Sequence, residues 1–385
     1  MHPVESFAID IEPSEVDELR DRLRQTRWPD EVEAAAWDYG TSLPYLRELI
    51  AYWAESFDWF ARQEELNRWS HYRARLDGLA IHFVHERGKG PAPLPIVLTH
   101  GWPSTFVELL ELASRLSDPA AYGADPADAF DVVVPSLPGY GFSSPPRFRG
   151  PARTATCWRE LMTDVLGYER FGAHGGDIGA GVSSRLAFDF PESLIGIHVT
   201  ATWDAYRGEG AEPPTPEEQA YLDALDDWEE REGAYSAIQG TKPQTLGYGL
   251  NDSPAGLAAW IVEKWRSWGD TGGEVESRFS KDDLLTTISI YWHTQTITPS
   301  VRAYYESQHA HRRLRADDRI TVPTAVAQFP NECVPESHPP RSWVERTYSD
   351  LRSFRRFPRG GHFAAKEEPD LVAEDIRAFF RELRR

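Results

Sequence analysis

The chain is poor in cysteine and has no long apolar segment. Its 385 residues include two cysteines, Cys157 and Cys333, which can form at most one bridge and cannot supply four ligands to a structural zinc ion. The longest apolar runs, such as residues 94–98, are far shorter than the roughly 20 residues that cross a bilayer. Residues 1–5 show neither the basic nor the apolar part of a secretory signal, so a cytoplasmic protein is expected.

Basic charge is also scarce, because 41 Lys and Arg face 61 Asp and Glu, a net charge of −20. Such a surface repels phosphate backbones and anionic lipid, so neither nucleic acid nor an acidic membrane is expected as a partner. The apolar fraction of 41% is ordinary for a globular chain and excludes a wholly disordered one. The length predicts two lobes, or one domain with large insertions.

Residues 1–71 read as a helical, tryptophan-rich extension. A helix is expected to begin at Ser14-x-x-Asp17, which is similar to a capping box. Residues 72–202 then follow the strand–helix–strand rhythm of a parallel sheet, opened by a hairpin around Asp77-Gly78. This segment predicts the first part of an α/β core.

An acidic, proline-containing segment follows, and it leads into amphipathic patterns at residues 255–268 and 282–305. Residues 203–311 therefore read as an inserted helical lid. Residues 312–385 resume the strand pattern and end in a helix near 371–383, which predicts the second part of the core.

One glycine-rich segment, His174-Gly-Gly-Asp-Ile-Gly-Ala-Gly, lies where a strand should lead into a helix. A nucleophile elbow needs small residues two positions before and after the reactive side chain, and Gly175 and Gly179 flank Asp177 in this way. The alternative is a phosphate-binding turn, but G-x-G-x-x-G is not matched in register and a carboxylate at the apex would oppose a pyrophosphate. The pattern favours Asp177 as a nucleophile.

Two further segments complete a candidate site. His100-Gly-Trp-Pro follows an apolar strand and is similar to an oxyanion loop, which would offer the backbone N–H of Trp102 beside that of Ile178. Gly360-Gly-His-Phe places His362 after the last expected strand. The acid that orients this histidine is expected at Glu332, with Glu336 as a local competitor. The order nucleophile, acid, histidine is that of an α/β-hydrolase.

An aspartate at the elbow points to attack on a strained or activated sp³ carbon, because a carboxylate is ionised at neutral pH and needs no base. The histidine can then activate water against the resulting ester. An epoxide also needs a proton donor for its oxygen, which a tyrosine can supply. The lid offers Tyr221, Tyr235, Tyr248, Tyr291, Tyr304 and Tyr305. A haloalkane or haloacid dehalogenase, or a catalytically silent protein that binds a hydrophobic ligand, stays open.

The motifs together resemble the microsomal-type epoxide hydrolases, including juvenile-hormone-type, fungal and bacterial members. The likeness covers nearly the whole chain. Besides the three segments above, it rests on Arg27-Trp-Pro-Asp, Thr241-Lys-Pro-Gln-Thr, Asn251-Asp-Ser-Pro-Ala-Gly-Leu-Ala-Ala-Trp and Phe329-Pro-Asn-Glu.

The resemblance implies an α/β-hydrolase with an N-terminal helical extension and a helical lid, which converts an epoxide to a vicinal diol without cofactor or metal. It implies Asp177 as nucleophile, Glu332 as acid, His362 as base, and Trp102 and Ile178 as oxyanion-hole amides. Its lid tyrosines fall on Tyr235 and Tyr304, with Tyr305 open as the second donor.

The resemblance also leaves several properties open. It implies a small hydrophobic or aromatic epoxide as substrate, and an N-terminal membrane anchor like that of the vertebrate members is not expected. Some similar bacterial members act in natural-product pathways such as enediyne biosynthesis, so detoxification and antibiotic biosynthesis both stay open. The oligomeric state is open as well, a homodimer included.

Overall fold

The computed structural model describes residues 4–146, 153–309 and 315–384. Within them a nine-stranded sheet has the order β1-β2-β3-β5-β4-β6-β7-β8-β9. Strands β1 to β3 and the β3–β5 pair are antiparallel, and the remaining pairs are parallel. The strands are β1 (Val4–Ser6), β2 (His71–Leu76), β3 (Leu79–Glu86), β4 (Leu94–Thr99), β5 (Phe130–Pro135), β6 (Phe171–Gly175), β7 (Leu194–Val199), β8 (Thr324–Gln328) and β9 (Leu351–Arg356). This mixed, mostly parallel sheet confirms the expected α/β-hydrolase fold.

The expected hairpin joins β2 to β3. Asp77 and Gly78 both have positive φ, 46° and 79°, as a two-residue turn that matches the twist of the strands requires. The strands at the centre of the sheet are mostly apolar and buried because helices cover both faces. Every residue of β5, for example, is buried.

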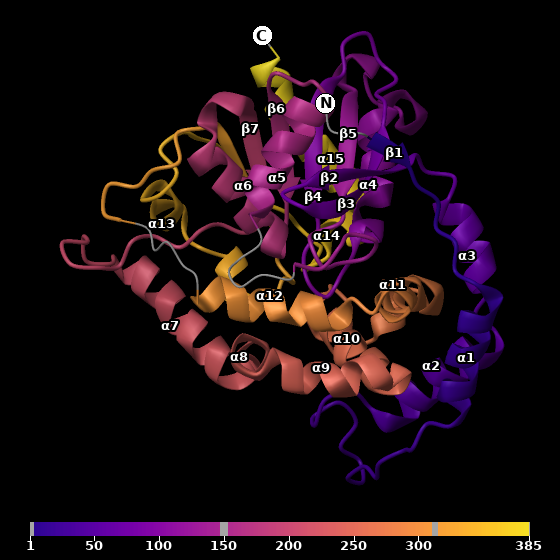
Figure 1. The fold of residues 1–385 in the computed structure, drawn as a ribbon. Helices are drawn as coiled ribbons and strands as arrows, with labels where there is room; N and C mark the ends of the chain where they lie inside the picture. Colours follow the sequence, from indigo (N-terminus) through magenta and orange to yellow (C-terminus); the bar gives the residue numbers. More distant parts are fainter. Residues whose placement is uncertain (1–3, 147–152, 310–314, 385) are drawn as a thin grey trace.

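Helices pack on both faces of the sheet, as Figure 1 shows. The helices α4 (Leu110–Ser117) and α15 (Pro369–Leu383) pack together on one face, and α5 (Thr154–Glu160) and α6 (Asp177–Asp189) on the other. The closing helix that the sequence predicts near 371–383 is α15. Its buried side chains, among them Ile376 and Phe380, lie on its sheet-facing side.

The N-terminal extension forms α1 (Pro13–Arg24), α2 (Leu43–Glu55) and α3 (Trp59–Leu66), which run from the sheet toward the lid in Figure 1. The predicted capping box at Ser14 is wrong, because α1 begins one residue earlier with Pro13 at its first turn and no side-chain cap. Proline is suited to that position, since its missing N–H would have no helical partner there. The sequence also missed β1, a short edge strand that pairs with β2.

The lid lies below the sheet in Figure 1 and consists of helices α7 to α12. Their bounds are α7 (Pro216–Glu232), α8 (Ala234–Thr241), α9 (Pro243–Asp252), α10 (Pro254–Trp268), α11 (Lys281–Thr294) and α12 (Ile297–His309). The pattern expected over 282–305 is two helices, because Gln295 adopts a left-handed conformation that ends α11. The extension braces this lid through hydrogen bonds of Trp53 with Ser289 and of Tyr52 with Asp282.

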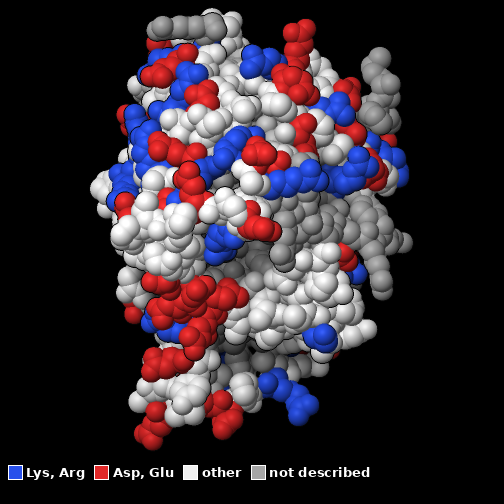
Figure 2. All heavy atoms as spheres, turned by 90° about the vertical axis from the view of Figure 1, so that its left-hand side faces the viewer, with Lys and Arg blue, Asp and Glu red and all other residues white. Residues whose placement is uncertain are grey.

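Acidic side chains gather on the lid half of the face that Figure 2 shows. Most belong to α7, where Glu218 is the buried exception and the other carboxylates are exposed. Part of the net charge of −20 is therefore solvated on the outside of the lid. Of the helices that the structure describes, none combines the length and the apolar character needed to span a membrane.

Candidate active site

The predicted site residues meet at one edge of the sheet, where the carboxyl ends of its parallel strands face the lid (Figure 1). The Trp102 loop follows β4, Asp177 follows β6, Glu332 follows β8 and His362 follows β9. Ligands of open α/β sheets bind at this edge, because the loops after neighbouring parallel strands converge there.

Asp177 lies at the apex of a sharp turn between β6 and α6. Its φ is 48°, a left-handed conformation that few non-glycine residues adopt and that recurs at functional sites. A side chain at Gly175 would overlap the backbone of Gly179, and one at Gly179 would overlap the carbonyl of Thr99. Both glycines are thus required by close backbone approach, as the elbow pattern predicts.

Backbone N–H groups hold one side of the Asp177 carboxylate. The Trp102 N–H donates to Asp177 Oδ1 at 2.7 Å, and the Ile178 N–H is a second donor. Asp177 is also the first residue of α6, whose positive N-terminal dipole favours a negative charge. The two amides expected from the sequence therefore face the same carboxylate.

His362 lies between two carboxylates. Its Nδ1 lies 2.9 Å from Glu332 Oε2 and 3.0 Å from Oε1, and its Nε2 lies 3.8 Å from Asp177 Oδ2. Glu332, the acid that the sequence predicts, is in contact with the ring, and the side chain of its competitor Glu336 lies outside what the structure describes. His362 thus connects the two carboxylates, because its Nε2 faces Asp177 and its Nδ1 contacts Glu332.

The base loop, residues 360–363, has all four of its backbone N–H groups hydrogen-bonded. Gly360 N–H donates to Asp270 Oδ2 at 3.0 Å, and His362 N–H donates to the carbonyl of Trp268 at 2.9 Å. Both acceptors lie at the end of α10, in the lid. Two of the four backbone contacts of the base loop are thus made to the lid.

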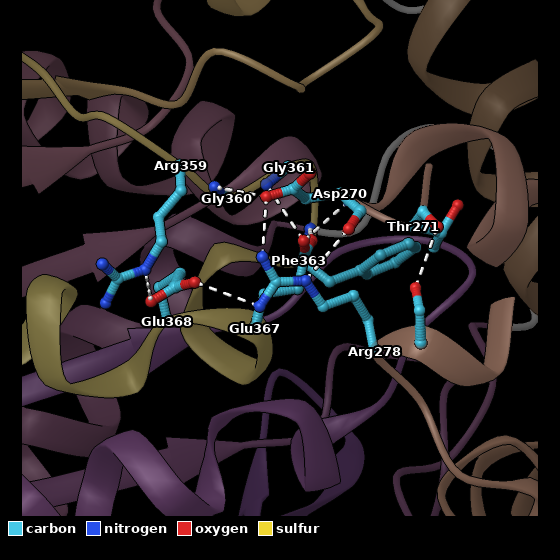
Figure 3. Close-up of polar contacts among 10 residues, drawn as sticks. Asp270, Thr271, Arg278, Arg359, Gly360, Gly361, Phe363, Glu367 and Glu368 are labelled. Carbon is cyan, nitrogen blue, oxygen red and sulfur yellow. Dashed lines mark hydrogen bonds and ion pairs between the residues drawn. The ribbon is translucent and has the colours of Figure 1, made fainter. Parts of the chain in front are cut away.

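Glu367 accepts the other two N–H groups of the base loop, those of Gly361 and Phe363, at 3.0 and 2.9 Å. It also accepts the Asp270 N–H at 2.7 Å, so two carboxylates cross-link the base loop and the lid, as Figure 3 shows. Arg278 adds a positive charge, because it pairs with Asp270 at 2.8 Å and with Glu368 at 3.2 Å. Burial raises the pKa of Glu367 to about 7 although these N–H groups oppose the shift.

The two expected lid tyrosines pack against the indole of Trp102. Tyr235, on α8, stacks on it with ring centroids 5.5 Å apart, and Tyr304, on α12, meets it edge-on at 5.8 Å. A hydrogen bond joins the two phenols. Tyr305 instead stacks on His309 and is 36% exposed. Tyr304, unlike Tyr305, therefore lies beside the nucleophile.

Burial and charge shift the ionisation of these groups. Burial raises the pKa of Asp177 above its ordinary value, opposed by His362 and the two backbone N–H groups. Burial disfavours the charged form of His362, but Glu332 and the nearby carboxylates outweigh it and raise its pKa to about 9. Burial, with Tyr235 and Asp177 nearby, raises the pKa of Tyr304 well above its ordinary value. These shifts favour an imidazolium at His362 and a protonated phenol at Tyr304 at neutral pH.

A cavity of about 1720 Å³ opens between sheet and lid, lined by Asp177, His362, Tyr235 and Tyr304 among others. A second cavity, of about 20 Å³, lies behind the nucleophile. Glu108 lines the second cavity and interacts electrostatically with His362 and Asp177. The sequence missed this residue, since a glutamate near the start of an expected helix carries no signal of burial.

Among the described residues, no His, Cys, Asp and Glu side chains form a group that could hold a metal ion.

Comparison with known proteins decides the family. Residues 4–109 match "Epoxide hydrolase N terminus" and residues 96–375 match "Alpha/beta hydrolase family". A protein of Stigmatella aurantiaca is 42% identical over 380 residues, 98% of this chain and 85% of that protein. "Epoxide hydrolase 1" of Oryctolagus cuniculus is 35% identical over 409 residues, 98% of this chain and 88% of that protein. The chain belongs to the microsomal-type epoxide hydrolase family.

Solved structures agree with this assignment. The Aspergillus niger epoxide hydrolase superposes with a TM-score of 0.85 at 28% identity, over 99% of this epoxide hydrolase and 97% of that chain. The juvenile hormone epoxide hydrolase of Bombyx mori gives 0.83 at 31% identity, over 100% and 95%. The protein is thus an epoxide hydrolase, a hydrolase of a family that needs no cofactor.

Proposed function

We propose that this epoxide hydrolase opens its substrate through a covalent ester on Asp177, which water activated by His362 then hydrolyses to a vicinal diol. The observation that carries the proposal is the line of contacts from Asp177 through His362 to Glu332, with backbone N–H groups at the opposite side of the Asp177 carboxylate. These contacts support the assignment of Asp177 as nucleophile, His362 as base and the two backbone N–H groups as oxyanion hole.

In the first step, Asp177 Oδ2 attacks one epoxide carbon and the carbon–oxygen bond of the ring breaks. Oδ1 accepts the Trp102 N–H, so it becomes the carbonyl oxygen of the ester. The departing oxygen needs a proton, and the phenols of Tyr235 and Tyr304 lie on the lid side of the same cavity. The raised pKa of Tyr304 keeps its phenol protonated at neutral pH, which is the form that donates.

In the second step, water attacks Cγ of the ester, its proton moves to His362 Nε2, and the Trp102 and Ile178 N–H groups bind the oxyanion. Collapse breaks the ester bond, and the alkoxide leaves as diol with a proton from His362. The regenerated Asp177 carboxyl then loses the other proton of the water, which replaces the proton that the tyrosine gave in the first step. Glu332, at 2.9 Å from Nδ1, orients the ring and stabilises its positive charge.

Ester formation itself prepares the base. In the free enzyme the negative charge of Asp177 helps to raise the pKa of His362 to about 9, so the ring is protonated at neutral pH. The ester carries no charge, so this contribution disappears and the pKa of His362 falls. His362 therefore becomes a better base after the first step than before it.

The substrate of this enzyme is proposed to be a bulky, largely apolar epoxide. The cavity of about 1720 Å³ exceeds the roughly 300–1,000 Å³ of ordinary ligand pockets. Aromatic side chains, Phe188, Trp203 and Tyr140, line its walls. A panel of styrene-like, aliphatic and polycyclic epoxides, assayed for diol, ranks these classes directly.

The covalent step is tested with His362→Gln, which keeps the approximate size of the side chain but removes the base. We expect this variant to accumulate an adduct of enzyme plus epoxide, detected by intact mass and located on Asp177 by peptide mapping. Turnover to diol should fall by on the order of 1,000-fold. Asp177→Asn is the matched control, and it should form neither adduct nor diol.

Diol formation by His362→Gln at the wild-type rate without an adduct would refute the covalent route. Release of halide from alkyl halides, with no diol from any epoxide in the panel, would contradict the epoxide substrate itself.

A further inference from the structure

The steps described above do not use the cavity of about 20 Å³ that lies behind the nucleophile. Its size matters, because a cavity needs roughly 10–15 Å³ to hold one water and 2–4 polar partners to keep it there. Asp177 and His362 line this small cavity and also the large substrate cavity, and they are the two residues that the two linings share. Asp177 and His362 thus lie between the large cavity, which can hold the substrate, and the small cavity, which can hold one water.

Glu108 is the carboxylate of the small cavity. It belongs to the 3-10 turn Phe106–Leu109 that follows the Trp102 loop, and its Oε2 accepts a hydrogen bond from the hydroxyl of Ser104. Its Oε1 has no hydrogen-bond partner among the described residues. A carboxylate can accept several hydrogen bonds, and Glu108 lines the cavity and keeps part of its surface accessible, so it can accept one from a water there.

We propose that the small cavity binds the water that hydrolyses the Asp177 ester, and that Glu108 holds this water by accepting one of its hydrogen bonds. The other proton of the water then faces His362, which removes it as the oxygen bonds to Cγ of Asp177. Glu108 only holds the water and takes no proton from it, so the proton of the water moves to His362 as in the second step described above. The inference rests on the proposed covalent route.

The charges around the cavity fit this role. Burial raises the pKa of Glu108 to about 7, although the hydrogen bond from Ser104 opposes the shift. Burial lowers the pKa of His100 to about 4 and also that of His174, so these two further cavity residues stay neutral. The titratable groups left to face the water are Glu108, Asp177 and His362, and once the ester has formed Asp177 carries no charge.

If Glu108 holds a water behind the ester, hydrolysis does not require water to enter through the substrate cavity. A bulky apolar alkyl group on Asp177 fills the lid side of the site and excludes solvent from it. Water stored behind the ester stays within reach of His362 throughout. The storage site would therefore matter for hydrolysis of the ester and not for its formation.

The test is a single-turnover experiment with enzyme in excess over the epoxide that the wild type converts fastest. Rapid quench and intact mass give the rate at which the adduct forms and the rate at which it decays. For Glu108→Gln we expect formation within about twofold of wild type and decay slower by on the order of 10- to 100-fold, the value of one charge-assisted hydrogen bond. Glu108→Asp, which keeps the charge but shortens the side chain, should also slow decay selectively.

Glu111→Gln is the matched control, because Glu111 lies one turn along the same helical segment and its carboxylate pairs with Lys366 at the surface. It should leave both rates unchanged. Equal slowing of formation and decay by Glu108→Gln, or no slowing of decay in either Glu108 variant, would overturn the inference. Failure of the covalent route looks different, since His362→Gln would then trap no adduct at all.

Discussion

The two halves of the active site are held by different kinds of contact. On the core side, hydrogen bonds from backbone N–H groups hold Asp177, and those of the base loop hold His362. On the lid side, Tyr235 and Tyr304 are placed by ring packing against Trp102. Hydrogen bonds are directional, whereas ring packing fixes a distance and a tilt with more tolerance.

Trp102 belongs to both halves, because its backbone N–H binds the nucleophile and its ring carries the two tyrosines. Trp102 therefore connects the two tyrosines directly to the nucleophile. The comparison teaches that the base loop, which holds His362, should govern ester hydrolysis, whereas the lid tyrosines should act in ester formation.

The two halves can be told apart by variants that slow adduct formation or adduct decay alone. The largest such change is expected for the lid tyrosines. Replacing both Tyr235 and Tyr304 by Phe keeps the rings but removes the protons, so adduct formation should slow by on the order of 1,000-fold while adduct decay stays near the wild-type rate. Each single variant should lose about tenfold, since the remaining phenol still donates. Rapid-quench measurement of the adduct gives both rates.

Tyr305→Phe is the natural comparison, because Tyr305 is adjacent in sequence but stacks on His309. It should change adduct formation by less than about twofold. A loss as large as that of Tyr304→Phe would show that the wrong tyrosine faces the substrate.

A smaller effect is expected at the contacts between base loop and lid. Asp270→Ala removes the acceptor of the Gly360 N–H and a partner of Arg278 (Figure 3). Adduct decay should slow by about tenfold, the value of one charge-assisted hydrogen bond, and adduct formation should change little.

Arg359→Gln serves as the control for that variant. Arg359 pairs with Glu368 in the same network, but its side chain is 56% exposed and it touches no N–H of the base loop. Both rates should stay near wild type, since exposed ion pairs contribute little. If Asp270→Ala slows formation and decay alike, these contacts support the fold and do not position the base.

The core half could be predicted from the sequence because its chemistry is local. Two glycines around Asp177, the Trp102 loop and the His362 loop are short motifs, and the chain order of an α/β-hydrolase relates them. The strands were predictable for the same reason, since β5 and β7 are apolar runs bounded by turns. Element ends were less predictable, as the shifted start of α1 shows.

The positions of the lid tyrosines depend on packing between segments that lie far apart in the sequence. The same holds for the residues that surround the catalytic side chains, such as Glu108 and Glu367. Whether Tyr304 or Tyr305 faces the cavity depends on how α12 is rotated against α8 and α9, which no short motif records. The burial of Glu108 and the cross-link between Asp270 and Glu367 likewise join residues with unremarkable neighbours in sequence. Composition and periodicity contain no signal for either.

The central claim is that the substrate is bonded to Asp177 before water enters the product. The most direct measurement is one turnover in water enriched in oxygen-18, with enzyme in excess over epoxide. The account predicts that the peptide containing Asp177 gains the label and the diol does not, because water attacks the ester carbonyl of the enzyme. A labelled diol with an unlabelled Asp177 peptide would contradict it, since water would then have attacked the epoxide itself.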